Sequence, residues 1–266
     1  MSLQTQNSLS MQLHYKTFGQ GDPLIIVHGL FGTLDNWQTL GKQFAEAYSV
    51  YLVDQRDHGR SPHSEAITFP LLGEDLGAFM EQQYMYETHL LGHSMGGKSV
   101  MQFALDHPDR VDKLIVVDVA PKAYSASHHE IFEALFAVDL LNLSSRGEAN
   151  DFLATRIKST SVRQFLLKNL SRDKENGGFK WKLNLPLIYR HYNDILANVV
   201  WDGTPYDKPT LFIRGSESDY VQEEDFPTIY RMFPQARIET VQGAGHWVHA
   251  QQPEELYRLV SEFLAE

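Results

Sequence analysis

The sequence predicts an α/β fold, with a mostly parallel central sheet, helices on both faces and an inserted helical cap. Short apolar runs typical of buried strands alternate with helical segments along the first 120 residues. This alternation stops over residues 121–200 and resumes before the C-terminus. We therefore predict a core made of residues 11–120 and 201–266 and a helical cap made of residues 121–200.

Residues 11–18 alternate loosely between apolar and polar side chains and are followed by a turn at residues 19–23. This pattern predicts an antiparallel strand at the edge of the sheet. Six further short segments are expected to complete the sheet. These are residues 24–27, 50–53, 88–91, 114–119, 210–213 and 237–241.

Helices are expected between these strands and through the cap. In the core we expect them over residues 37–47, 70–83 and 98–105, and in a final helix with Pro253 in its first turn. In the cap we expect them over residues 130–141, 148–157 and 162–170, followed by a turn at Gly177-Gly178 and no strand. The charged loop that contains Arg56 and Asp57 is interpreted as structural, with both side chains fixing loops near the site.

Composition excludes several classes of protein. The chain has no cysteine, which excludes disulfides, thiolate metal sites and cysteine nucleophiles and fits a cytoplasmic location. A net charge of −11 argues against nucleic acid as a partner, because its phosphates require a basic face. No segment approaches the roughly 20 apolar residues of a membrane span. Residues 1–10 lack the layout of a signal peptide and are excluded from the predicted fold.

The stretch Gly92-His93-Ser94-Met95-Gly96 lies between a predicted strand and a predicted helix. The pattern Gly-x-Ser-x-Gly at such a junction is typical of a nucleophile elbow, which exposes a serine hydroxyl at the edge of a sheet. Glycines are needed there because strand and helix nearly touch. The amide of Met95 then lies at a helix N-terminus, where it can donate to a developing oxyanion.

A second glycine-rich turn, His28-Gly29-Leu30-Phe31-Gly32, follows the second predicted strand. Its glycines allow backbone amides to approach a substrate closely. Together with the serine motif downstream, it predicts a second oxyanion donor from the amide of Leu30 or Phe31.

A serine nucleophile needs a base, and the base needs an orienting acid. His246 is the candidate base, because it follows the last predicted strand in Gly-Ala-Gly-His-Trp. Two residues are candidates for the acid. Asp118 ends an otherwise apolar strand, where burial of a carboxylate requires a partner. Asp219 follows the penultimate strand one residue later than the usual position, which holds Ser218, so we favour Asp118 and keep Asp219 as the alternative.

No metal and no cofactor is expected. The His128-His129 pair and the pair His58 and His63 lack further ligands at a suitable spacing. The dinucleotide pattern Gly-x-Gly-x-x-Gly is absent from the sequence.

Because these motifs follow one another in this order, the chain resembles an α/β hydrolase over nearly its whole length. More narrowly, it resembles a bacterial esterase subgroup that acts on acyl-CoA thioesters and small esters. The motifs that carry this narrower resemblance are His28-Gly-Leu-Phe-Gly, Gly92-His-Ser-Met-Gly-Gly-Lys98, Val117-Asp-Val-Ala-Pro121, Gln164-Phe-Leu-Leu167 and Ala244-Gly-His-Trp-Val-His-Ala250. The resemblance implies a triad of Ser94, Asp118 and His246, with an oxyanion hole from Met95 and Leu30 or Phe31.

The resemblance also implies an ester or acyl thioester as the small-molecule substrate. The distribution of charge is relevant to whether the substrate is an anionic thioester. Residues 121–200 carry a net charge of +3, whereas the rest of the chain carries −14. A mildly basic cap could receive the phosphates of CoA through side chains that the sequence leaves available, or these could be ordinary solvated helix faces. The available side chains are Arg146, Arg156, Arg163 and Lys168.

We therefore predict a serine esterase or thioesterase that works through an acyl-enzyme. Two alternatives use the same residues. One is a cofactor-free lyase or carbon–carbon hydrolase, because the cap and not the triad sets the substrate. The other is a ligand receptor with very slow turnover.

Overall fold

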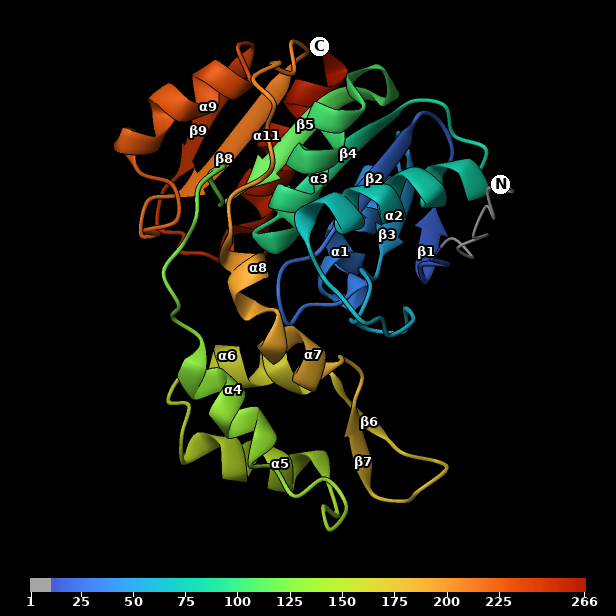
Figure 1. The fold of residues 1–266 in the computed structure, drawn as a ribbon, viewed down its shortest axis with the longest axis vertical. Helices are drawn as coiled ribbons and strands as arrows, with labels where there is room; N and C mark the ends of the chain where they lie inside the picture. The colour runs from blue at the N-terminus through green and yellow to red at the C-terminus, as the bar shows by residue number, and fades with distance from the viewer. Residues whose placement is uncertain (1–10) are drawn as a thin grey trace, which may run out of the picture.

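The structure, a computed structural model, describes residues 11–266, so the expectation for residues 1–10 lies outside the described residues. Its centre is a seven-stranded sheet with the order β1-β3-β2-β4-β5-β8-β9 (Figure 1). Only β1 is antiparallel to its neighbour, and the other five pairings are parallel. The strands are β1 (Tyr15–Phe18), β2 (Pro23–Val27), β3 (Ser49–Val53), β4 (Thr88–His93), β5 (Val111–Val117), β8 (Thr210–Gly215) and β9 (Ala236–Val241). The predicted fold class and the antiparallel edge strand are confirmed.

Helices cover both faces of this sheet, because successive side chains of a buried strand point to opposite faces. Ile25 and Val27 of β2 pack in a cluster with side chains of α2, α3 and α9. Leu24 and Ile26 pack in a second cluster with side chains of α1 and α11. The helices of the core are α1 (Gln38–Phe44), α2 (Phe69–Gln82), α3 (Met95–Asp106), α9 (Phe226–Met232), α10 (Val248–Gln251) and α11 (Pro253–Ala265).

The chain between β5 and β8 forms five helices and a hairpin, of which α4 to α7 and the hairpin lie beyond the end of the sheet (Figure 1). Their apolar side chains form a third cluster, which also includes Phe31 and Met95 of the core. The elements are α4 (His129–Phe136), α5 (Arg146–Ala154), α6 (Thr160–Leu167), β6 (Leu170–Arg172), β7 (Phe179–Trp181), α7 (Leu185–Arg190) and α8 (Tyr192–Leu196). This cluster brings the inserted segment directly onto the loop that holds Phe31.

The expectation of no strand in this segment is wrong. β6 and β7 pair antiparallel on either side of the turn at Gly177-Gly178. Each strand has only three residues, which is too short for a period of two to show in the sequence. The helix expected over residues 130–141 also ends earlier, at Phe136, and helices α7, α8, α9 and α10 were not predicted.

No helix formed by residues 11–266 is both long enough and apolar enough to cross a membrane.

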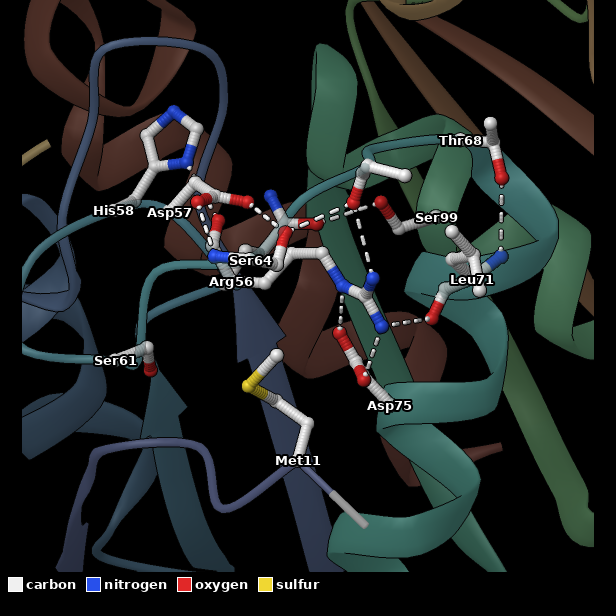
Figure 2. Close-up of polar contacts among 12 residues, drawn as sticks. Met11, Arg56, Asp57, His58, Ser61, Ser64, Thr68, Leu71, Asp75 and Ser99 are labelled. Carbon is white, nitrogen blue, oxygen red and sulfur yellow. Dashed lines mark hydrogen bonds and ion pairs between the residues drawn. The ribbon is translucent and has the colours of Figure 1, made fainter. Parts of the chain in front are cut away.

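The loop after β3 is fixed to α2 by a buried ion pair, as expected for Arg56 (Figure 2). The guanidinium donates to both carboxylate oxygens of Asp75, with N–O distances of 2.6 and 2.7 Å. Burial raises the pKa of the Asp75 carboxyl, and the charge of Arg56 opposes that rise. The neighbouring Asp57 accepts hydrogen bonds from Ser64 and from Asn184 of the inserted segment. Both side chains therefore fix loops, and Asp57 also ties the core to the inserted segment.

We expect Arg56→Met to lower the free energy of unfolding by about 3 kcal/mol, because Asp75 is left buried without its partner. Urea unfolding followed by circular dichroism measures the change. The double variant Arg56→Met with Asp75→Leu should recover most of it, since no charge is then buried. Arg258→Met removes two exposed ion pairs of α11, with Glu255 and Glu262, and serves as the control, with little change expected. A loss in Arg56→Met no larger than in this control would contradict the prediction.

Candidate active site

Ser94 lies in a strained turn between β4 and α3. Its backbone has φ of 54° and ψ of −121°, a conformation that side-chain-bearing residues rarely adopt. The turn is possible because glycines flank it. A Cβ on Gly92 would lie 2.3 Å from the carbonyl oxygen of Gly96, and one on Gly96 would lie 2.4 Å from the carbonyl oxygen of His28. The two glycines thus let strand, helix and the loop after β2 meet around the serine.

His246 lies in the loop between β9 and α10, and its side chain contacts Ser94. Its Nε2 atom is 3.0 Å from the Ser94 hydroxyl oxygen. The ring stacks on Tyr220, with centroids 3.7 Å apart and planes 20° apart. The Nε2 atom of the buried His93 is 2.8 Å from the backbone carbonyl oxygen of His246, to which it donates. Ring and backbone of His246 are therefore both fixed by neighbouring side chains.

Asp118 follows β5, is fully buried and has φ of 51°. One of its carboxylate oxygens lies 2.8 Å from Nδ1 of His246 and also accepts from the hydroxyl of Ser218. The other oxygen accepts from the amide of Gly215 at 2.9 Å. Because a carboxylate only accepts, Nδ1 of His246 carries the proton and Nε2 is free to accept from Ser94.

The two candidate acids are placed differently. Asp118 contacts His246, whereas the side chain of Asp219 is exposed and makes no hydrogen bond with His246 within the described residues. Ser218, which occupies the usual acid position in this loop, instead donates to Asp118. The structure therefore brings Ser94, His246 and Asp118 together and leaves Asp219 outside.

Leu30, Phe31 and Met95 line one pocket together with Ser94 and His246. Met95 is the first residue of α3, so its amide has no acceptor within the helix. The amides of Leu30 and Phe31 donate to no other residue of the described chain. Phe31 has φ of 59°, and its carbonyl accepts from the side chain of the buried Asn169, which turns that oxygen toward the inserted segment.

Gln55 fixes the loop that carries Leu30 and Phe31 through hydrogen bonds to His28. The amide of Gln55 donates to Nε2 of His28 at 3.1 Å, and its side chain donates to the carbonyl of His28 at 2.7 Å. Nδ1 of His28 therefore carries the proton and donates to the carbonyl of Gly29. The hydroxyl of Ser99, on α3, donates to the Gln55 side chain at 2.6 Å. One side chain thus links this loop to the helix that begins after Ser94.

The rest of the pocket is mainly apolar, and the inserted segment supplies much of it. Its apolar lining residues there include Ile131, Val162, Phe165, Leu166, Ile195 and Leu196. No group of acidic, histidine or cysteine side chains within residues 11–266 is arranged to hold a metal ion. The arrangement is that of a hydroxyl nucleophile beside a base, with unpaired amides and an apolar binding surface.

Comparison with known proteins identifies the family. A family model described as the α/β hydrolase fold matches residues 22–253. The chain is an α/β hydrolase. It is 39% identical to a protein of Danio rerio named sn-1-specific diacylglycerol lipase ABHD11, over 96% of this chain and 83% of that protein. It is 37% identical to Esterase YbfF of Escherichia coli, over 91% of this chain and 92% of that protein.

A solved structure, titled "Marine microorganism esterase", superposes on this hydrolase with a TM-score of 0.93. The two chains are 40% identical, and the match covers 96% of this chain and all of the other. The hydrolase thus belongs with proteins named esterases and lipases, enzymes that act on ester bonds.

Sequence reasoning did not predict several side chains around the site of this hydrolase. Asn169 contacts Phe31, and Tyr220 stacks on His246. No local sequence pattern predicts either contact. Lys98 is buried beside the pocket, where its ammonium donates to the carbonyls of Leu196 and Ala197 and where burial lowers its pKa to about 7. Its only sequence signal was a cation in the first turn of a helix, a position that favours anions.

The buried histidines of this hydrolase, four of which have the clearest shifts in pKa, predict that its stability decreases as the pH falls. Burial lowers the pKa of His28 and His58 to about 4 and that of His249 to about 3, and it lowers the pKa of His93 well below 6.5. The unfolded chain then binds protons below its ordinary histidine pKa while the folded chain does not. The stabilisation is complete above that pKa and decreases below it, by about 1 kcal/mol for each ring between about pH 7.5 and about pH 5.5.

Urea midpoints across this pH range measure the effect. Burial raises the pKa of Asp54 and Asp75, which acts in the opposite sense, but carboxyl groups titrate mainly at lower pH. His249→Phe keeps a ring stacked on Trp37 and removes one of the four groups, so its pH dependence should be weaker. A folding stability equal at both ends of the range would contradict the prediction.

Proposed function

We propose that this hydrolase cleaves carboxylic esters through a covalent acyl-enzyme on Ser94. The observation that carries the proposal is the line of hydrogen bonds from Ser94 through His246 to Asp118, at the wall of a mainly apolar pocket. Nucleophile, base and orienting acid in this geometry are what acyl transfer needs. The named esterases and lipases among the relatives support the same bond type.

In the first half of the reaction, the Ser94 hydroxyl oxygen attacks the ester carbonyl carbon while Nε2 of His246 takes the hydroxyl proton. Asp118 stabilises the resulting imidazolium through Nδ1. The negative charge that develops on the carbonyl oxygen is stabilised by the amides of Met95 and of Leu30 or Phe31. Collapse of the tetrahedral intermediate breaks the bond to the alcohol oxygen, which takes the proton from His246.

In the second half, a water molecule gives a proton to His246 and attacks the acyl carbon on Ser94. The same amides stabilise the second oxyanion, and its collapse returns the proton to Ser94 and releases the carboxylic acid. Residues 121–200 act as a cap in this proposal. Their apolar side chains receive the acyl chain, whereas residues 11–120 and 201–266 form the catalytic core. The proposed location of the enzyme is the cytoplasm.

The proposal predicts that Ser94→Ala abolishes hydrolysis of p-nitrophenyl butyrate. Asp118→Asn should lower kcat by about 10³- to 10⁴-fold, because an amide favours the wrong tautomer of His246. Asp219→Asn is the matched control and should keep kcat within about twofold, because its side chain is exposed and does not contact His246. Steady-state kinetics on folded proteins measures all three. Turnover in Ser94→Ala close to that of the wild type would contradict the mechanism, and a larger loss in Asp219→Asn than in Asp118→Asn would reverse the choice of acid.

Acyl-CoA thioesters are a second candidate substrate class. Two of the basic side chains expected to be available for CoA are already used: Arg163 is buried against the carbonyls of Ile157 and Lys158, and Arg146 donates to those of Leu167 and Leu170. The position of Lys168 supports the thioester hypothesis. This basic side chain lines a groove that shares two residues with the catalytic pocket, so it could bind a phosphate of CoA while the acyl chain lies in the pocket. The shared residues are Phe165 and Trp247.

If CoA lies in this groove, Lys168→Gln should raise the KM for butyryl-CoA by about 3- to 10-fold, because one charge-assisted contact to a phosphate is lost. The kinetics with p-nitrophenyl butyrate should stay unchanged. Arg156→Gln removes an exposed charge of the same segment that does not line the groove, and serves as the control. Equal effects of both variants on butyryl-CoA would exclude a role for the groove, and no turnover of butyryl-CoA would limit the enzyme to oxygen esters.

A further inference from the structure

His128 lines the catalytic pocket from the inserted segment, on the same pocket wall as Phe31. It immediately precedes α4, and its ring meets the ring of Phe31 edge to face, with centroids 5.9 Å apart. It is also near enough to His246 for the two rings to interact electrostatically. The proposed mechanism does not use this ring.

The hydrogen bonds of Tyr192 fix which nitrogen of His128 carries the proton. The phenol oxygen accepts from the amides of Ser127 and His128, at 3.2 and 3.1 Å. Its two lone pairs are then occupied, so its own hydrogen points to Nδ1 of His128, 2.5 Å away. Nδ1 is therefore an acceptor, and the neutral ring carries its hydrogen on Nε2. Burial lowers the pKa of His128 to about 4, so the ring is neutral at neutral pH.

The Nε2–H group of His128 donates to no residue within 11–266, and it is not among the buried atoms that lack a partner. It is a donor that is open to solvent on a side chain lining the pocket. When a substrate fills the pocket and displaces water from this donor, the loss of its hydrogen bond costs free energy unless the substrate supplies an acceptor. A bound substrate with an acceptor oxygen at this wall would satisfy it.

We propose that His128 binds substrate by donating Nε2–H to a second oxygen in the alcohol part of the ester. The alcohol part is favoured because His246, which lines the same pocket, must protonate the leaving alcohol oxygen. Other side chains that line the pocket, such as Ile131 and Leu166, are apolar and suit the hydrocarbon of an acyl chain. The enzyme would then prefer esters of alkoxy- or hydroxy-substituted alcohols over simple alkyl esters. This inference rests on the proposed ester hydrolysis.

The test compares kcat/KM for 2-methoxyethyl butyrate and butyl butyrate, which have alcohol parts of nearly equal length. The methoxy oxygen can accept a hydrogen bond but cannot donate one, so it reports a donor on the enzyme. We expect the wild type to prefer 2-methoxyethyl butyrate by about 3- to 10-fold, the usual effect of one neutral hydrogen bond. His128→Leu should abolish this preference, and His128→Gln, which keeps a donor, should retain part of it.

Two further variants separate binding from folding. His129→Leu changes the neighbouring exposed ring and should keep the wild-type ratio. Tyr192→Phe frees Nδ1 to take the proton, so the ratio should decrease toward one. An unchanged ratio in His128→Leu, with hydrolysis still dependent on Ser94, would overturn the role of His128 alone. Failure of the wild type to hydrolyse either ester, or p-nitrophenyl butyrate, would overturn the proposed function itself.

Discussion

The site depends on a close contact between backbones at the turn that holds Ser94. β4, α3 and the loop after β2 approach so closely that neither Gly92 nor Gly96 has room for a Cβ atom. This contact forces Ser94 into its strained conformation and puts its hydroxyl at the edge of the sheet. It also places the start of α3 beside the loop that carries Leu30 and Phe31. One packing constraint therefore sets the positions of both the nucleophile and the amides that would stabilise an oxyanion.

A second constraint acts on the other half of the sheet. Asp118 is buried after β5, and a buried carboxylate is stable only when its oxygens are satisfied. Its partners are Gly215 at the end of β8, Ser218 in the loop after β8 and His246 in the loop after β9. Because the carboxyl ends of parallel strands share one edge of the sheet, three loops that are distant in sequence converge there. The same carboxylate thus joins these loops and orients the imidazole.

The core carries Ser94, His246 and Asp118, and the inserted segment adds further side chains to the pocket around them. It supplies most of the apolar wall of the pocket, holds the carbonyl of Phe31 through Asn169, and contributes the imidazole of His128. Its own apolar cluster includes Phe31 and Met95, so packing of this segment and the shape of the site are not independent. Substrate preference in this hydrolase is therefore expected to follow changes in residues 121–200, whereas changes around Ser94 should affect reaction with every ester.

The sequence by itself determined the fold class, the seven strands of the sheet and the antiparallel edge, because these depend on local hydrophobic periodicity. It also singled out Ser94 and His246 from their motifs, and it favoured Asp118 over Asp219 because a strand-end carboxylate needs a partner. Tertiary structure alone decided which carboxylate reaches His246, since one residue of offset in a tight loop redirects a side chain. It also decided that Arg163 is buried, that residues 170–181 form a hairpin, and that Tyr192 fixes the proton of His128. These features rest on contacts between residues far apart in the chain, which no local pattern records.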